Sequence, residues 1–290
     1  MGLCCPPEID WNGGARGRPF FLLEGNDIIP RIGLGTYGLT GDGGLSAMLS
    51  AIGLGYRHLD TAQTYGTEEN VGRAVARSEI DRREFFVTTK ITASNLGRLA
   101  ASVDDSLDVM GLAHADLVLI HWPAPSDDPP VSRYIGELAK LQDTGKARLI
   151  GVSNFTRRHV DEAIAEIGEG RLATNQFEQH VFLQNRLLAA HCRERGIVPT
   201  AYMPLAGGNL GGNAVLDAVA RKHGVPVNQV ALAFLLRLGS IVIPKSATPE
   251  RQKSNLGAAD VTLDDADMVA LAGLDRSERY IKPSWGPAWD

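Results

Sequence analysis

The chain has 290 residues, of which 44% are hydrophobic, and it carries a formal net charge of -5 at pH 7. An acidic balance without any run of Lys or Arg argues against nucleic acid and against a membrane surface as partners. No basic and apolar segment opens the chain, so we expect no signal peptide, and no apolar stretch approaches the roughly 18 residues that cross a bilayer. We also expect no disulfide framework from Cys4, Cys5 and Cys192. We therefore expect a monomeric, cytoplasmic protein that acts on a small molecule.

The predicted elements begin after an irregular start. Residues 1–18 are rich in Pro, Gly and Arg without any periodicity, so we expect a mobile extension ahead of a single domain that spans 19–290. Segments 20–23 and 28–32 are short and apolar, and the turn residues Glu-Gly-Asn-Asp separate them. This pattern predicts a hairpin.

From residue 56 onward, apolar β-rich segments alternate with helical patterns. Strands are predicted at 56–60, 85–90, 116–121, 148–153, 173–178, 198–203 and 241–245, with a weaker candidate at 259–263. Helices are predicted at 95–110, 131–143, 156–167, 186–195, 213–223 and 227–238. Such alternation is typical of parallel strands joined by crossover helices. We predict an α/β fold, a (β/α)8 TIM barrel with the N-terminal β-hairpin added, in preference to an open doubly wound sheet.

In a barrel of this kind, the chemistry lies at the carboxyl ends of the strands. The first three predicted strands end at Asp60, Lys90 and His121, which are 30 and 31 residues apart, and Tyr65 lies in the loop after Asp60. Taken alone, each residue has an ordinary explanation as a helix cap, a solvated charge or a packing group. Because successive units bring an acid, an amine and an imidazole to one rim, we predict that the four side chains form a catalytic site.

These four side chains suit proton transfer to a carbonyl oxygen. A free Tyr has a pKa of about 10, and an ammonium group beside it, here Lys90, would lower that pKa by stabilising the phenolate. Asp60 would keep Lys90 charged and in place, while His121 would orient the substrate carbonyl. Reduction also requires hydride, which no side chain supplies, so a nicotinamide cofactor is implied.

Residues 33–38, Gly-Leu-Gly-Thr-Tyr-Gly, match the G-x-G-x-x-G pattern of dinucleotide-binding domains. We do not predict a Rossmann domain, because that pattern must join a strand directly to a helix. Here Pro30 precedes it, and the glycines within 41–44 are expected to delay the next helix. Glycines permit close approach of the backbone, so the loop is expected to line the active site.

A phosphate site is predicted late in the chain. Thr248 is a good N-cap residue and Pro249 suits the first helical position, while Lys245 and Ser246 precede this positive end of a helix. Arg251 lies in the first turn, where the helix dipole disfavours a cation. We interpret the three as an anion site suited to the ribose 2′-phosphate of NADPH. The alternative is a solvated Arg251 paired with a neighbouring carboxylate.

With these residues in place, the chain resembles the aldo-keto reductases over residues 20–290. The resemblance rests on motifs at 33–36, 57–66, 88–90, 119–123, 151–155, 174–176 and 243–255. Within the family, it is most similar to the bacterial 2,5-diketo-D-gluconate reductase B group, whose members also reduce methylglyoxal. The similarity to that group lies in His121-Trp122-Pro123-Ala124-Pro125, in Tyr202-Met203 and in the ending at 286–290.

The resemblance implies a role for each matching residue. Tyr65 would be the general acid, helped by Asp60, Lys90 and His121. Residues from several loops would hold NADPH or NADP+: Gly35, Thr36, Ser153, Asn154, Gln176, Tyr202, Leu205, Lys245, Ser246, Arg251 and Asn255. Of these, Ser153, Asn154 and Gln176 would bind the nicotinamide carboxamide, Tyr202 would stack on its ring and Asn255 would reach the adenine. A carbonyl substrate such as methylglyoxal or 2,5-diketo-D-gluconate would lie between Tyr37, Trp122 and Trp285, beside a C-terminal substrate loop at 276–290.

Two other functions fit the residues alone. One is a non-catalytic NADPH-binding regulatory subunit on the same fold, and the other is a barrel isomerase or lyase that uses Lys90 and His121 without hydride. The complete set of four rim residues favours the reductase over both. A metal enzyme is not predicted, because the sequence has no His-x-His or His-Glu-x-x-His spacing.

Overall fold

The computed structural model describes residues 20–22 and 28–290, so the extension expected at 1–18 lies outside the described residues. Its centre is a parallel sheet of eight strands, in which strands adjacent in sequence are also adjacent in space. These strands are β3 (Leu34–Gly35), β4 (His58–Asp60), β5 (Phe86–Ile91), β6 (Ala115–Ile120), β7 (Ala147–Ser153), β8 (Leu172–Glu178), β9 (Val198–Tyr202) and β10 (Ile241–Val242).

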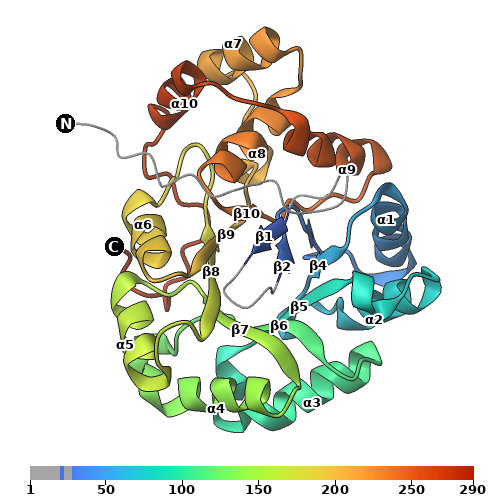
Figure 1. Cartoon of the computed structure of the whole chain (residues 1–290), viewed down its shortest axis with the longest axis vertical. Helices are drawn as coiled ribbons and strands as arrows, with labels where there is room; N and C mark the ends of the chain where they lie inside the picture. The colour runs from blue at the N-terminus through green and yellow to red at the C-terminus, as the bar shows by residue number, and fades with distance from the viewer. Residues whose placement is uncertain (1–19, 23–27) are drawn as a thin grey trace.

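Hydrogen bonds join the first strand of this sheet to the last. The Gly33 N–H donates to the Val242 carbonyl (2.9 Å), the Val242 N–H donates to the Arg31 carbonyl (2.9 Å), and the Gly35 N–H donates to the Pro244 carbonyl (3.3 Å). Ile32 and Val242 form a parallel bridge at the same place. The sheet is therefore closed, and the predicted (β/α)8 barrel is confirmed (Figure 1).

One predicted strand is wrong. The candidate at 259–263 is not a strand, because Gly257–Asp260 form the short 3-10 helix η6. The remaining strand of the barrel is β3, which lies inside the glycine motif at 33–38. Two residues are too few to show an alternating pattern, so periodicity could not reveal this strand.

The glycines of that motif permit the strands to approach closely at this seam. A Cβ on Gly35 would lie 2.8 Å from the Ile243 carbonyl oxygen, and one on Gly33 would lie 2.7 Å from Nδ1 of His58. The expected delay of the next helix is wrong, since α1 begins at Gly41. The Rossmann interpretation is excluded for a different reason, because the strand belongs to a closed barrel.

Helices surround the barrel (Figure 1). They are α1 (Gly41–Leu54), α2 (Glu68–Arg77), α3 (Leu99–Met110), α4 (Val131–Asp143), α5 (Arg157–Ile167), α6 (Arg186–Glu194), α7 (Ala214–His223), α8 (Val227–Arg237), α9 (Pro249–Leu256) and α10 (Asp265–Ala272). All six predicted helices are present, with α4 at its predicted bounds. Helices α7 and α10 pack together outside the ring (Figure 1). No helix within 20–22 and 28–290 is long and apolar enough to cross a membrane.

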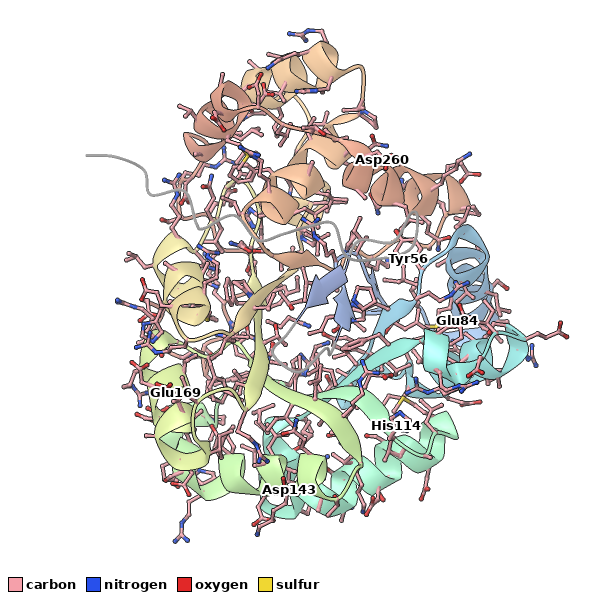
Figure 2. All side chains as sticks on the ribbon, in the orientation of Figure 1. Tyr56, Glu84, His114, Asp143, Glu169 and Asp260 are labelled. Carbon is pink, nitrogen blue, oxygen red and sulfur yellow. The ribbon has the colours of Figure 1, made fainter. Side chains whose placement is uncertain are left out.

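Buried side chains fill both the outer layer and the inside of the barrel. Tyr56 is 1% exposed and lies between α1 and α9, where its hydroxyl donates to the Gln252 carbonyl (3.0 Å; Figure 2). By contrast, Glu84, Asp143 and Glu169 are exposed on the outer side of the ring (Figure 2). This outer layer buries the faces that the helices and the sheet turn toward each other.

A hairpin covers one end of the barrel interior. Strands β1 (Phe20–Leu22) and β2 (Ile28–Pro30) pair antiparallel, as predicted, and lie over the middle of the ring of strands in Figure 1. Ile29 of β2 packs against apolar side chains near the amino ends of the barrel strands, among them Phe86, Leu117, Leu149, Ala173 and Ile241. The carboxyl ends are left for the site.

Candidate active site

The structure brings together the four rim residues that the sequence predicted. Asp60 ends β4, Lys90 is the penultimate residue of β5, and His121 directly follows β6. Tyr65 ends the short 3-10 helix η1 (Gln63–Tyr65), which follows β4. The Lys90 ammonium lies 4.9 Å from the centroid of the Tyr65 ring, and the Tyr65 hydroxyl lies 3.5 Å from Nε2 of His121.

Lys90 and Asp60 form a buried ion pair. Their side chains are 0% and 2% exposed, and Nζ of Lys90 lies 2.5 Å from Oδ1 of Asp60. Nζ also donates to the Thr61 carbonyl (2.8 Å), while Oδ2 of Asp60 accepts from Nε2 of Gln176 (2.8 Å). Burial lowers the pKa of Lys90, but attraction to Asp60 and Tyr65 and hydrogen bonds with both together outweigh that effect and leave the pKa above its usual value. Lys90 is therefore charged at neutral pH.

Lys90 lowers the pKa of Tyr65, as predicted, but the net shift of that pKa is upward. Burial raises the pKa of Tyr65 more than Lys90 lowers it, and Asp60 raises it further by repelling a phenolate. Burial and, secondarily, Lys90 lower the pKa of His121 to about 3. At neutral pH the site thus holds a protonated Tyr65 beside a neutral imidazole and a fixed positive charge.

A second group of polar side chains lies on the neighbouring strand ends. Ser153 Oγ donates to the Gln176 carbonyl (2.8 Å), and Nδ2 of Asn154 donates both to Ser153 Oγ (3.1 Å) and to the His121 carbonyl (3.0 Å). The Tyr202 hydroxyl donates to Oδ1 of Asn154 (2.9 Å). Asn154 has a φ of 60°, a left-handed conformation that Asn tolerates better than most residues. The four residues predicted to bind nicotinamide therefore form one hydrogen-bonded cluster.

Gly35 and Thr36 position Asp60 from the other side. Gly35 pairs with Asp60 in the β3–β4 register. Thr36 is fully buried, and its hydroxyl donates to the Asp60 carbonyl (2.9 Å) and lies 3.0 Å from the hydroxyl of Thr67. Leu205, on the loop after β9, is half-buried against the core. Contact of these three residues with a cofactor stays a prediction.

The predicted anion site lies at the start of α9. Thr248 occupies the N-cap position and Pro249 the first turn, as predicted, although the Thr248 side chain makes no capping hydrogen bond. Its N–H instead donates to the buried Ser246 Oγ (3.3 Å). Lys245 and Arg251 are exposed, and neither forms an ion pair with a carboxylate of the described residues. Arg251 is thus solvated, as in the alternative, but without the carboxylate partner that the alternative gave it, and the anion site stays a prediction.

Asn255 lies further along α9 and is almost entirely buried. Its Oδ1 accepts from Nδ2 of Asn228 (2.9 Å), and the same nitrogen donates to Ser254 Oγ (3.0 Å). Asn228 thus fixes the orientation of the Asn255 amide. The adenine contact implied for Asn255 stays a prediction.

Aromatic rings flank the rim. Tyr37 is 69% exposed and packs edge-on against Tyr65, with ring centroids 5.1 Å apart. Trp122 packs edge-on against Trp285 (5.1 Å) and Trp289 (6.0 Å), which both belong to the C-terminal segment. The two C-terminal tryptophans thus pack on Trp122, the residue that follows His121 in the chain.

Sequence reasoning missed Glu178, the last residue of β8. Its side chain is 0% exposed, and its carboxylate accepts hydrogen bonds from the N–H groups of Tyr280 and Ile281 (2.8 Å each). The rule that identified Asp60 and Lys90, a polar residue at a strand end, applies equally to Glu178. Gln176 alone was taken as the contribution of this strand.

The chain is similar to known proteins over most of its length. The sequence profile of the Aldo/keto reductase family matches residues 31–276. The methylglyoxal reductase DkgB of Yersinia pestis is 41% identical over 265 residues, which cover 90% of this chain and 99% of that protein. A solved structure provisionally named 2,5-diketo-D-gluconic acid reductase B is 37% identical, with a TM-score of 0.86, covering 90% of this chain and 94% of that one. An aldo-keto reductase complexed with NADPH is 29% identical, with a TM-score of 0.86, covering 93% of this chain and 91% of that one.

Proposed function

Because this chain belongs to the aldo/keto reductase family, whose relatives include methylglyoxal reductases, it is an oxidoreductase that acts on carbonyl groups, and we propose that it reduces aldehydes and ketones with NADPH, using Tyr65 as the proton donor. The observation that carries the proposal is that buried Asp60 and Lys90 lie together with half-buried Tyr65 and His121 at the carboxyl rim of the barrel. Family membership sets the reaction class, and this geometry supports the proposed roles within it.

Tyr65 suits the role of proton donor because it keeps its proton at neutral pH. As the carbonyl oxygen gains negative charge during reduction, the Tyr65 hydroxyl transfers its proton to that oxygen. The Lys90 ammonium, 4.9 Å from the centroid of the Tyr65 ring, stabilises the phenolate left behind. Asp60 holds Lys90 in place, so the charge is fixed before the reaction begins.

His121 would orient the substrate. Its imidazole is neutral at physiological pH, since its pKa is about 3. A neutral ring with a proton on Nε2 donates one hydrogen bond to a carbonyl oxygen placed beside the Tyr65 hydroxyl. The ring would not compete with Tyr65 as the acid, because it carries no second proton to release.

The residues present fit a dinucleotide that carries a 2′-phosphate. When bound, NADPH supplies the hydride. The hydrogen-bonded cluster of Ser153, Asn154 and Gln176 offers amide and hydroxyl groups to a carboxamide, and Tyr202 presents a half-buried ring next to it. Lys245 and Arg251, exposed and without carboxylate partners in the described structure, would bind the phosphate at the start of α9, next to Ser246.

The substrate class is inferred from the walls of the rim. Tyr37, Trp122 and Trp285 would surround a small carbonyl compound, and methylglyoxal and keto-sugar acids are the first candidates. Support for these two comes from the names of similar proteins, a methylglyoxal reductase and a 2,5-diketo-D-gluconic acid reductase B. The rim aromatics are also consistent with larger aldehydes that carry an apolar group.

The test replaces Tyr65 by Phe, which removes only the hydroxyl. We expect kcat for methylglyoxal reduction to fall by about 10²- to 10⁴-fold, with NADPH affinity, measured by quenching of tryptophan fluorescence, unchanged. Tyr56→Phe is the matched control, since it also removes a buried hydroxyl but at the α1–α9 contact, and it should keep its turnover. If the wild-type chain binds NADPH but reduces no member of a broad carbonyl panel, the non-catalytic subunit replaces the proposal.

A further inference from the structure

The C-terminal tail, residues 275–290, returns to the rim after α10. Figure 1 shows this red segment leaving α10 and ending beside α6. At its end, Asp290 accepts from the Arg157 N–H at the first residue of α5 (2.8 Å). The tail carries Trp285 and Trp289, which pack against Trp122 of the barrel; we call these three residues the tryptophan cluster.

Glu178 holds the tail where it reaches the rim, directly after the Phe182 carbonyl, which accepts from the N–H groups of Arg276 (3.2 Å) and Glu278 (3.0 Å). Oε1 accepts from the Tyr280 N–H (2.8 Å) and Oε2 from the Ile281 N–H (2.8 Å), so one carboxylate binds two consecutive peptide groups. His180 Nε2 adds a third hydrogen bond (3.1 Å). Because the Phe182 N–H donates to Nδ1 of His180, the ring proton lies on Nε2 and points to Glu178.

The carboxylate form suits this position although it is fully buried. Burial raises the pKa of Glu178, but hydrogen bonds from His180 and then from the tail outweigh burial and hold the pKa below its usual range. An ionised carboxylate only accepts hydrogen bonds, which matches three donors. Two tail N–H groups bound to its two oxygens fix both the position and the direction of the chain there.

Arg279 links the same corner to the tryptophan cluster. Its guanidinium lies over the ring of Trp289, 3.6 Å from the centroid. It also donates to Oδ1 of Asn185 (3.2 Å), and Nδ2 of Asn185 donates to the Glu178 carbonyl (2.6 Å). Both the backbone and the last tryptophan of the tail are therefore tied to the end of β8.

We propose that Glu178 is a specificity-determining positioning residue: its carboxylate anchors the tail and thereby sets the tryptophan cluster as the wall that selects carbonyl substrates bearing a bulky apolar group. This inference rests on the proposed function. Glu178 touches neither the reacting atoms nor the proton donor. Its loss should therefore change the binding of substrates that reach the wall, without changing the chemical step.

The test replaces Glu178 by Gln. This keeps the size of the side chain but places its amide N–H against one of the two tail N–H groups, those of Tyr280 and Ile281. For an aromatic aldehyde such as para-nitrobenzaldehyde, we expect KM to rise about tenfold, as for the loss of one hydrogen bond to a charged group. For methylglyoxal, which carries only a methyl group to place against the tryptophan cluster, we expect KM and kcat to stay within about twofold. The near-ultraviolet circular dichroism of the tryptophan cluster should weaken, because its rings lose their fixed geometry.

Asp116→Asn is the matched control. Asp116 is equally buried, at 1% exposure, and its carboxylate accepts from the Val87 N–H (2.8 Å) and pairs with Arg82 (2.7 Å). It lies at the start of β6, at the opposite end of the barrel, so its replacement should lower stability but leave both KM values and the dichroism unchanged. If Glu178→Gln does not fold, Ile281→Pro removes one of the two tail N–H groups without touching the barrel, and it should give the same split.

Two outcomes overturn the proposal. One is a folded Glu178→Gln with wild-type KM for the aromatic aldehyde and wild-type dichroism. The other is the same rise in KM in Asp116→Asn, which would trace the effect to general destabilisation. If the wild-type chain reduces no carbonyl compound, the proposed function fails by itself, and the dichroism of the variants still decides whether Glu178 anchors the tail.

Discussion

Replacing Asp60 by Asn would show how much the Lys90–Asp60 pair contributes to stability, apart from its proposed role in proton transfer. The variant leaves the Lys90 ammonium fully buried, with the neutral Thr61 carbonyl at 2.8 Å as an acceptor. Removing one partner of a buried ion pair costs about 3–5 kcal/mol of unfolding free energy. The new amide oxygen would still accept from Gln176, so we expect the loss to arise from the uncompensated charge.

A double variant, Asp60→Asn with Lys90→Met, tests that origin. Methionine has a similar length and no charge, and its main cost is the Thr61 carbonyl that loses its donor, about 1 kcal/mol. We therefore expect the double variant to be more stable than Asp60→Asn by about 2 kcal/mol or more in urea unfolding, while neither variant reduces methylglyoxal. A double variant no more stable than the single one would refute the reasoning, because the charge would then not be what destabilises Asp60→Asn.

The stability that the Lys90–Asp60 pair contributes should depend on pH in one direction. The pKa of Lys90 in the folded chain is raised. Its contribution is thus fully present below the unfolded value of about 10.4 and is lost as pH rises through the folded value. The stability difference between the wild type and the double variant should hold steady from about pH 7 to pH 9 and narrow only at higher pH.

Two further predictions concern the reaction itself. The pKa of His121 is about 3, and that of Tyr65 lies above its usual value. We therefore expect kcat/KM for reduction to stay constant between about pH 5 and pH 7 and to fall only at alkaline pH. A fall in kcat/KM below about pH 6.5 that disappears in His121→Gln would contradict this. Arg251→Ala should raise KM for NADPH about tenfold and leave KM for NADH unchanged, since only NADPH carries the 2′-phosphate. Lys253→Ala, at the other end of α9, should change neither, and an equal rise for both cofactors in Arg251→Ala would place the phosphate elsewhere.

The sequence predicted those parts of the fold in which one element carries its own signal. Helix α4 appears at its predicted bounds, 131–143, because a buried stripe repeats over more than three turns. Strand β3 was missed because its two residues show no period, and the weak pattern at 259–263 was taken in its place. Closure of the barrel depends on pairing between residues about 200 positions apart, as between Ile32 and Val242, which no local pattern contains.

Local signals also decided which residues of the candidate site could be predicted. Asp60, Lys90 and His121 were found because strand ends recur once per unit along the chain. Glu178 obeys the same rule, but its partners are tail residues 102 and 103 positions away, so no local pattern could show what its carboxylate binds. The lowering effect of Lys90 on the Tyr65 pKa was predicted, but the net rise of that pKa was not, because burial, which a sequence does not reveal, outweighs Lys90.

Gln176 connects Asp60 with the hydrogen-bonded cluster that begins at Ser153, because of its register between β7 and β8. Gln176 pairs with Ser153 across β7 and β8, so its carbonyl accepts from Ser153 Oγ, and its side chain crosses the barrel to Oδ2 of Asp60. A slip of one residue would turn that side chain to the opposite face of the sheet and break the connection. Asp60 is held in turn by Gly35, whose strand closes the barrel. The glycines at the seam therefore matter to the site, because they permit the close approach of strands that closes the barrel and holds Asp60, part of the proposed proton-donating group, against the cluster proposed to bind nicotinamide.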